Sequence, residues 1–163
     1  MNQPDQAFGA ALYEIGHLTY VWTNTESLLV HVIAGLLGCD KDRALLVYVT
    51  LSTTRARLDL VERLAKSGPP KAARDQILGC TKRLAKLSGE RNFYNHALYA
   101  FDPENGAIST IQMRISDRGS ELKIGKRQPL DRAAISDLQQ VIRDLTALNH
   151  DIWQMIRQQG FPI

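Results

Sequence analysis

The chain has 163 residues, of which 44% are hydrophobic and 23% are charged, and its formal net charge is +3 at pH 7. These values are typical of a globular domain with its own core, and they argue against a disordered chain. No apolar run approaches the roughly 20 residues that span a bilayer, and the N-terminus lacks the basic and apolar regions of a signal peptide. We therefore expect a single cytoplasmic domain over residues 1–163.

The cysteines and histidines do not predict a metal site. Cys39 and Cys80 form no CxxC pair, and His17, His31 and His150 have no metal-ligand spacing with one another. Structural zinc sites need their ligands clustered in such short motifs. We therefore expect no metal, and we expect the cysteines to be the free thiols of a reducing compartment. The sequence also has no Walker loop and no dinucleotide-binding fingerprint, so we expect no other cofactor.

The first third of the chain predicts one long helix. Apolar residues recur in steps of three and four from about residue 5 to residue 37, and Gly38 follows in the position that ends many helices. Thr23-x-x-Glu26 also fits a capping box, so a break near Thr23 is an alternative. In a continuous helix Glu26 faces inward and needs a cationic partner, for which Arg91 is one candidate.

Three further helices are predicted before residue 100. Asp40 is a suitable N-cap for the first. The segment Ser52-Thr53-Thr54 caps the second, which ends at Gly68-Pro69-Pro70 because proline cannot continue a helix. The third helix runs from about Lys71 to Tyr99.

The remaining segment contains a strand-like stretch and a last helix. After a turn at 102–106, apolar residues alternate with more polar ones from Ala107, and Asp117-Arg118-Gly119-Ser120 is turn-forming, which predicts a β-hairpin at about 107–126. Asp131 then caps a helix that continues to Gly160. The predicted fold class is all-α, an up-and-down bundle of four to five helices with one small β-hairpin inserted before the last helix.

The end of the helix that starts near residue 71 carries a polar arc. At about 100° per residue, Arg91, Asn92, Asn95 and His96 cover little more than a third of the helix circumference. Arg91 falls on the apolar stripe, where a guanidinium is costly to bury without a partner. A cation, two amides and an imidazole on one arc mark this helix end as the candidate functional site.

The segment Arg91-Asn92-x-x-x-His96 resembles the Arg-polar-x3-His motif of the HEPN superfamily, which includes many metal-independent endoribonucleases. The resemblance implies a helical domain in which Arg91, Asn92 and His96 are catalytic. It also implies a homodimer in which two motifs face each other, an RNA substrate and, for toxins of this superfamily, a cognate antitoxin protein.

Other residues are candidates for supporting roles. Glu26, Asn95 and Tyr94 are candidates to support the motif residues. Positively charged residues on one row of the same helix are candidates to bind RNA phosphates, unless they simply form a solvated surface: Arg74, Lys82 and Lys86. Tyr94, like the other aromatic residues near the motif, either stacks on bases or packs in a core or a dimer contact.

The alternative function is a non-catalytic helical module for dimerisation or partner binding. In that case Arg91 pairs with a buried carboxylate, and Asn92 and His96 form structural hydrogen bonds. An open basic cleft around Arg91 and His96 would favour the ribonuclease, whereas complete burial of both side chains would favour the alternative.

Overall fold

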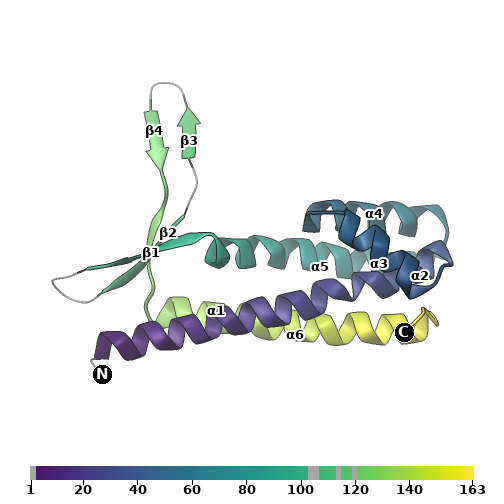
Figure 1. Ribbon diagram of the computed structural model, residues 1–163, viewed down its shortest axis with the longest axis horizontal. Coiled ribbons are helices and arrows are strands. Elements are labelled where there is room, and N and C mark those ends of the chain that lie inside the picture. Colours follow the sequence, from purple (N-terminus) through teal and green to yellow (C-terminus); the bar gives the residue numbers. More distant parts are fainter. Residues whose placement is uncertain (1–2, 103–106, 113–114, 119–120) are drawn as a thin grey trace. The chain divides into compact units, whose positions relative to one another are not determined.

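The computed structural model describes residues 3–102, 107–112, 115–118 and 121–163, with side chains for 8–102, 107–112 and 125–163 (Figure 1). The described chain is mostly helical, and its short antiparallel strands are inserted before the last helix, so the predicted fold class is confirmed. The elements along the described chain are α1 (Gln3–Ser27), α2 (Leu29–Leu37), α3 (Lys41–Thr50), α4 (Thr54–Ser67), α5 (Lys71–Asn95), β1 (Ala97–Phe101), β2 (Ile108–Gln112), β3 (Ile115–Arg118), β4 (Glu121–Ile124), β5 (Arg127–Pro129) and α6 (Arg132–Gln158).

The chain divides into two compact units. Unit 1 comprises residues 1–20 and 89–142, and unit 2 comprises residues 21–88 and 143–163. The single domain expected from the sequence stays a prediction, and each unit is described by itself below.

Unit 2 is a helical bundle. It contains α2, α3 and α4 together with segments of α1, α5 and α6. Side chains from several of these helices are excluded from solvent, as the apolar stripes in the sequence predict. The largest of them are Trp22, Val32, Ile33, Ile77, Leu84, Leu145, Leu148, Ile152, Met155 and Ile156.

The predicted helix ends of unit 2 are confirmed by their capping contacts. The Asp40 side chain accepts a hydrogen bond of 2.8 Å from the backbone N–H of Arg43, and the Thr53 hydroxyl accepts one of 3.1 Å from Ala56. Gly38 ends α2 with φ of 62°, a left-handed conformation that favours glycine. These short polar signals therefore act as the sequence suggested.

The C-terminal residues of unit 2 pack against α2. Nδ1 of His31 donates a hydrogen bond of 2.8 Å to the Pro162 carbonyl. The ring of Phe161 lies so close to Gly35 that a Cβ atom at this position would overlap with it. Gly35 is therefore required by close packing rather than by backbone conformation.

Unit 1 contains a three-stranded antiparallel sheet in the order β1-β2-β5, in which Leu98 pairs with Ile111 and Thr110 pairs with Gln128. The strands β3 and β4 form a separate antiparallel ribbon. A small buried cluster joins the sheet to the helices of this unit: Ala11, Ile108 and Leu130, with Phe8, Tyr99, Ala134 and Ile135 packed against it.

The structure corrects two predicted helices and confirms the start of the last one. The first predicted helix is two helices that meet at Leu28, and the break near Thr23 is wrong because α1 continues through that residue. The helix predicted to reach Tyr99 ends at Asn95, because residues 97–101 pair with β2 as strand β1. The N-cap at Asp131 is confirmed, since its carboxylate accepts a hydrogen bond of 3.0 Å from the backbone N–H of Ala134.

The predicted hairpin is only partly right. Pairing of Ile115 with Ile124 confirms a hairpin over the second half of 107–126. Strand β2 is not part of that hairpin, because it pairs with β1 and β5 instead. Met113, most of the turn predicted at 102–106, and Gly119-Ser120 lie outside the described residues.

Candidate functional site

The predicted polar arc lies on the last two turns of α5, in unit 1. Arg91, Asn92 and Asn95 belong to the helix, and His96 follows directly after it. The backbone N–H of His96 donates to the Asn92 carbonyl at 3.2 Å, so His96 still completes a helical hydrogen bond before the chain enters β1. The four residues therefore keep the angular spacing that a helix gives them.

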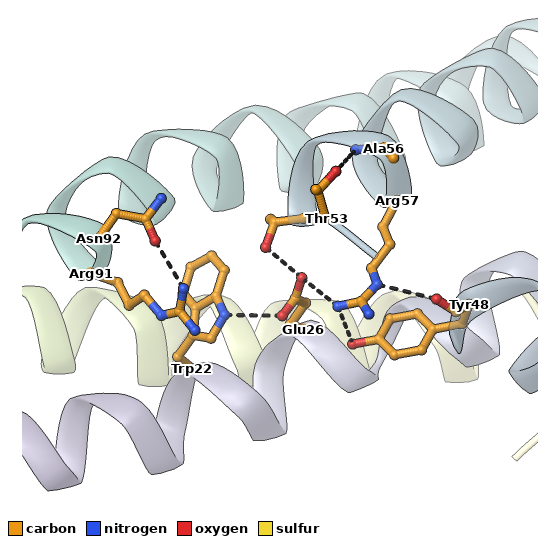
Figure 2. Close-up of polar contacts among 9 residues, drawn as sticks. Trp22, Glu26, Tyr48, Thr53, Ala56, Arg57, Arg91 and Asn92 are labelled. Carbon is orange, nitrogen blue, oxygen red and sulfur yellow. Dashed lines mark hydrogen bonds and ion pairs between the residues drawn. The ribbon is translucent and has the colours of Figure 1, made fainter. Parts of the chain in front are cut away.

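Arg91 and Asn92 are in direct contact. Nη1 of Arg91 donates a hydrogen bond of 2.8 Å to Oδ1 of Asn92 (Figure 2). The Arg91 side chain is half-buried and its Nε atom is buried, whereas Asn92 is exposed. This contact directs the amide oxygen toward the guanidinium, so the NH₂ group of Asn92 is the part of the amide that can donate to another partner.

His96 and Asn95 differ in their surroundings. His96 is exposed, whereas Asn95 is half-buried and its Oδ1 lies 3.3 Å from the Thr19 hydroxyl of α1. The same hydroxyl donates to the Ile15 carbonyl at 2.9 Å. Within unit 1, Asn95 thus positions the end of α5 against α1, while the imidazole remains accessible to a ligand.

Two tyrosines stabilise the end of α5. Tyr94 is 7% exposed, and its hydroxyl lies 3.4 Å from the Ala134 carbonyl. The Tyr99 hydroxyl donates a hydrogen bond of 2.9 Å to the Tyr94 carbonyl, which would otherwise lack a partner at the helix end. Burial raises the pKa of Tyr94, and Asp137 and Glu90 raise it further, so its hydroxyl stays protonated to a more alkaline pH than that of an exposed tyrosine. The interpretation of Tyr94 as a core residue is confirmed.

Glu26 belongs to a polar cluster in unit 2. It is 7% exposed, and its Oε1 accepts hydrogen bonds from Thr54 (2.6 Å) and from Nη1 of Arg57 (3.0 Å), while its Oε2 accepts one from Trp22 Nε1 (3.0 Å) (Figure 2). The prediction that Glu26 faces inward and needs a cation is confirmed. That cation is Arg57, whereas the sequence had suggested Arg91 as one candidate partner.

Arg57 is itself held by α3. Its Nε donates to the Tyr48 carbonyl at 3.2 Å, and its guanidinium lies 4.0 Å from the centre of the Tyr48 ring. This cluster joins α1, α3 and α4 within unit 2, which gives Glu26 a structural role. A supporting role of Glu26 toward the motif stays a prediction.

The candidate RNA-binding row also lies in unit 2. Lys82 and Lys86 are exposed on α5, whereas Arg74 is half-buried and its Nε lies 3.5 Å from an Asp75 carboxylate oxygen. An exposed lysine pair can contact phosphates, but a neighbouring carboxylate lowers the positive potential at Arg74. Phosphate binding by this row stays a prediction.

Two kinds of structure are not found among the described residues. No group of three or more His, Cys, Asp or Glu side chains there lies close enough together to hold a metal ion. None of the helices in the described part of the chain is both long enough and apolar enough to cross a membrane.

Three residues with clear positioning roles were not assigned those roles from the sequence. Arg57 pairs with Glu26, Thr19 contacts Asn95, and Tyr99 caps α5. An inward-facing arginine on the α4 segment could have signalled the first. The other two roles depend on contacts between distant segments, and their residue types carry no comparable signal.

Comparison with known proteins gives no family for this chain. It matches no protein-family model, no curated protein and no solved structure.

Proposed function

We propose that the chain is a metal-independent endoribonuclease of the HEPN type. The observation that carries the proposal is the arrangement of Arg91, Asn92 and His96 at one helix end. There a half-buried guanidinium contacts an exposed amide, and an exposed imidazole follows within six consecutive residues.

These groups fit the needs of RNA cleavage. The 2′-oxygen loses its proton to a base and attacks phosphorus, the bond to the 5′-oxygen breaks, and an acid protonates that oxygen. An imidazole can transfer protons near neutral pH, and a guanidinium matches the oxygens of the phosphorane. The products are a 2′,3′-cyclic phosphate and a 5′-hydroxyl. His96 takes the proton-transfer role, Arg91 stabilises charge, and Asn92 holds Arg91 and a phosphate oxygen.

One copy of the chain is incomplete for this reaction. The motif supplies one histidine, whereas cleavage needs both a base and an acid. A two-fold symmetric homodimer would supply the second imidazole from the partner's motif. The proposal therefore includes a homodimer.

The test is cleavage of a labelled RNA by purified protein in EDTA. We expect cyclic-phosphate products, a bell-shaped pH profile, and a loss of at least about 100-fold in Arg91→Ala and His96→Ala. The matched controls are Arg63→Ala and His150→Ala, which remove the same side chains from exposed positions on other helices. Absence of cleavage, or cleavage that survives both motif substitutions, would overturn the proposal.

The second candidate function is a non-catalytic helical module for dimerisation or partner binding. The observation that favours it is a charge-poor exposed face on α1, which is described in the next section. Dimerisation or partner binding that is unchanged by Arg91→Ala and His96→Ala, without RNA cleavage, would identify this function.

A further inference from the structure

The exposed side of α1 carries a regular stripe. Gly9, Tyr13, Gly16 and Tyr20 follow one another at steps of four, three and four, and all are exposed. The two tyrosines are large side chains with exposed fractions of 72% and 67%. A spacing of 4-3-4 is the repeat of a helix that packs along another helix.

This stripe is separate from the core face of the same helix. Ala11 and Leu18 are fully buried and lie on the opposite side, about half a turn away. α1 therefore has one apolar face that packs inside unit 1 and a second face with the pattern of a helix contact. The second face has no helix packed on it in the described chain, since its residues are exposed.

The exposed face of α1 also lacks charge. Its exposed positions between residues 9 and 20 contain no acidic residue, no lysine and no arginine: Gly9, Ala10, Leu12, Tyr13, Gly16, His17 and Tyr20. The exposed positions of α5, in contrast, include Lys82, Arg83 and Lys86. Depletion of charge and enrichment in tyrosine are typical of the centre of a protein interface.

Close packing among the described residues does not explain the two glycines on this face. In the part of the chain that the structure describes, a Cβ atom at Gly9 or Gly16 would meet no atom within 4 Å. Each glycine costs about 1 kcal/mol relative to alanine in a helix interior. Alanine would therefore fit and would stabilise the helix, unless another molecule must approach the backbone at these two positions.

We propose that this face binds a second copy of the chain, with the two α1 helices antiparallel about a two-fold axis midway between Glu14 and Ile15. Residue numbers that face each other then sum to 29, so Tyr13 meets Gly16 of the other copy and Tyr20 meets Gly9. Each large ring faces a position without a side chain. The stripe is thus complementary to itself in the antiparallel direction, as a two-fold interface requires.

The available area suits a small specific dimer. Leu12 (47% exposed) flanks the stripe, and Phe101 (55% exposed) packs on Phe8 beside Gly9, with ring centres 4.9 Å apart. Covering these side chains and the two tyrosines on both copies removes about 1,000 Å² from solvent, near the lower limit for a specific interface. The Tyr20 ring of the other copy reaches Gly9 next to this aromatic pair.

The dimer face lies beside the candidate site. Thr19 flanks the stripe and contacts Asn95 at the end of α5. In an antiparallel pair, the same flank of both helices lies on one side of the dimer, so the two α5 ends lie on that side as well. The dimer itself does not depend on the ribonuclease; the inference that it brings two copies of His96 to one face rests on the proposed function.

Cross-linking tests the geometry. In a Cys39→Ser background, a mixture of Gly9→Cys and Tyr20→Cys chains should form a disulfide-linked dimer under mild oxidation, while either variant alone should not. In the antiparallel dimer the two copies of residue 9 are about 16 Å apart along the helix axis, which is beyond the reach of a disulfide. Disulfide-linked dimers of each variant alone, with no disulfide between the two variants in the mixture, would indicate a parallel dimer and overturn the proposal.

A glycine substitution tests the interface without cross-linking. We expect Gly16→Leu to weaken dimerisation at least about 10-fold in sedimentation velocity, while thermal unfolding shows that the chain still folds. The matched control is Gly79→Leu, at an exposed helical glycine of α5 where a Cβ atom also meets nothing within 4 Å. A monomeric wild type, or equal dimerisation of both variants, overturns the proposal. A cross-linked dimer that cleaves no RNA would leave the dimer standing and refute only the proposed function.

Discussion

The buried carboxylate of Glu26 provides the sharpest test of the packing in unit 2. Glu26→Ala removes three hydrogen bonds, from Trp22, Thr54 and Arg57, and leaves the Arg57 guanidinium without its carboxylate. Removing one partner of a buried ion pair costs about 3–5 kcal/mol. The Arg57 side chain is 17% exposed and keeps its contacts to Tyr48, so we expect about 3 kcal/mol, the lower end of that range.

The assay is urea denaturation at pH 7, followed by circular dichroism. A loss of about 3 kcal/mol is a large share of the 5–15 kcal/mol that usually stabilises a folded protein, so the shift in midpoint should be clear. The control is Glu62→Ala, which removes a more exposed glutamate whose Oε2 lies 4.0 Å from Lys66 Nζ. This exposed pair should contribute no more than about 1 kcal/mol.

A double-mutant cycle isolates the ion pair. Glu26→Ala and Arg57→Ala should be non-additive by about 1–3 kcal/mol, because each single variant already disrupts the contact that the other removes. Equal costs for Glu26→Ala and Glu62→Ala, or additive effects of the two substitutions in the cycle, would refute the role assigned to the cluster.

Three further predictions concern single side chains. Thr53→Ala should destabilise the chain by about 1 kcal/mol in the same assay, with Thr53→Ser as the hydroxyl-retaining control, because the hydroxyl caps α4; equal stability of both variants would contradict this. Cys80 should react with iodoacetamide more slowly in the folded chain than in urea, because burial raises the pKa of its thiol. Mass spectrometry measures both rates, and equal rates would show that folding does not protect this thiol. The pKa of Tyr94 is raised above 10.0, so its neutral form is favoured in the folded state and this stability is lost as the pH rises further. Between pH 8 and pH 11, the free energy of unfolding in urea should therefore fall less in Tyr94→Phe than in the parent chain. An equal fall in both proteins would contradict this prediction.

The elements that could be predicted from the sequence are those set by local signals. The N-caps at Asp40, Thr53 and Asp131 all form the contact that their position suggests, because a cap depends only on its own helix turn. Gly38 likewise marks a helix end through its backbone conformation. Local chemistry was sufficient at these four positions.

The errors arise where distant segments decide the structure. Residues 97–101 continue the stripe of α5 in sequence, and they become β1 only because β2 lies alongside with the right register. The pairing of Glu26 with Arg57 also depends on a distant segment, because Arg57 lies on α4. Helix periodicity indicates which residues face inward, but it does not indicate which of them contact one another. The four residues of the candidate site lie together as the sequence predicts, because they share one helix end and need no distant segment to bring them together; their function stays a prediction.

The contact between Phe161 and Gly35 has a practical consequence for work with this chain. The residues after α6 pack against α2: the Phe161 ring covers Gly35, and the Pro162 carbonyl accepts a hydrogen bond from His31. A fluorescent protein or affinity handle should therefore be joined after Ile163, which is 70% exposed. Removing the last three residues would take away both the ring that covers Gly35 and the carbonyl that binds His31, so a shortened chain would lose native contacts of α2.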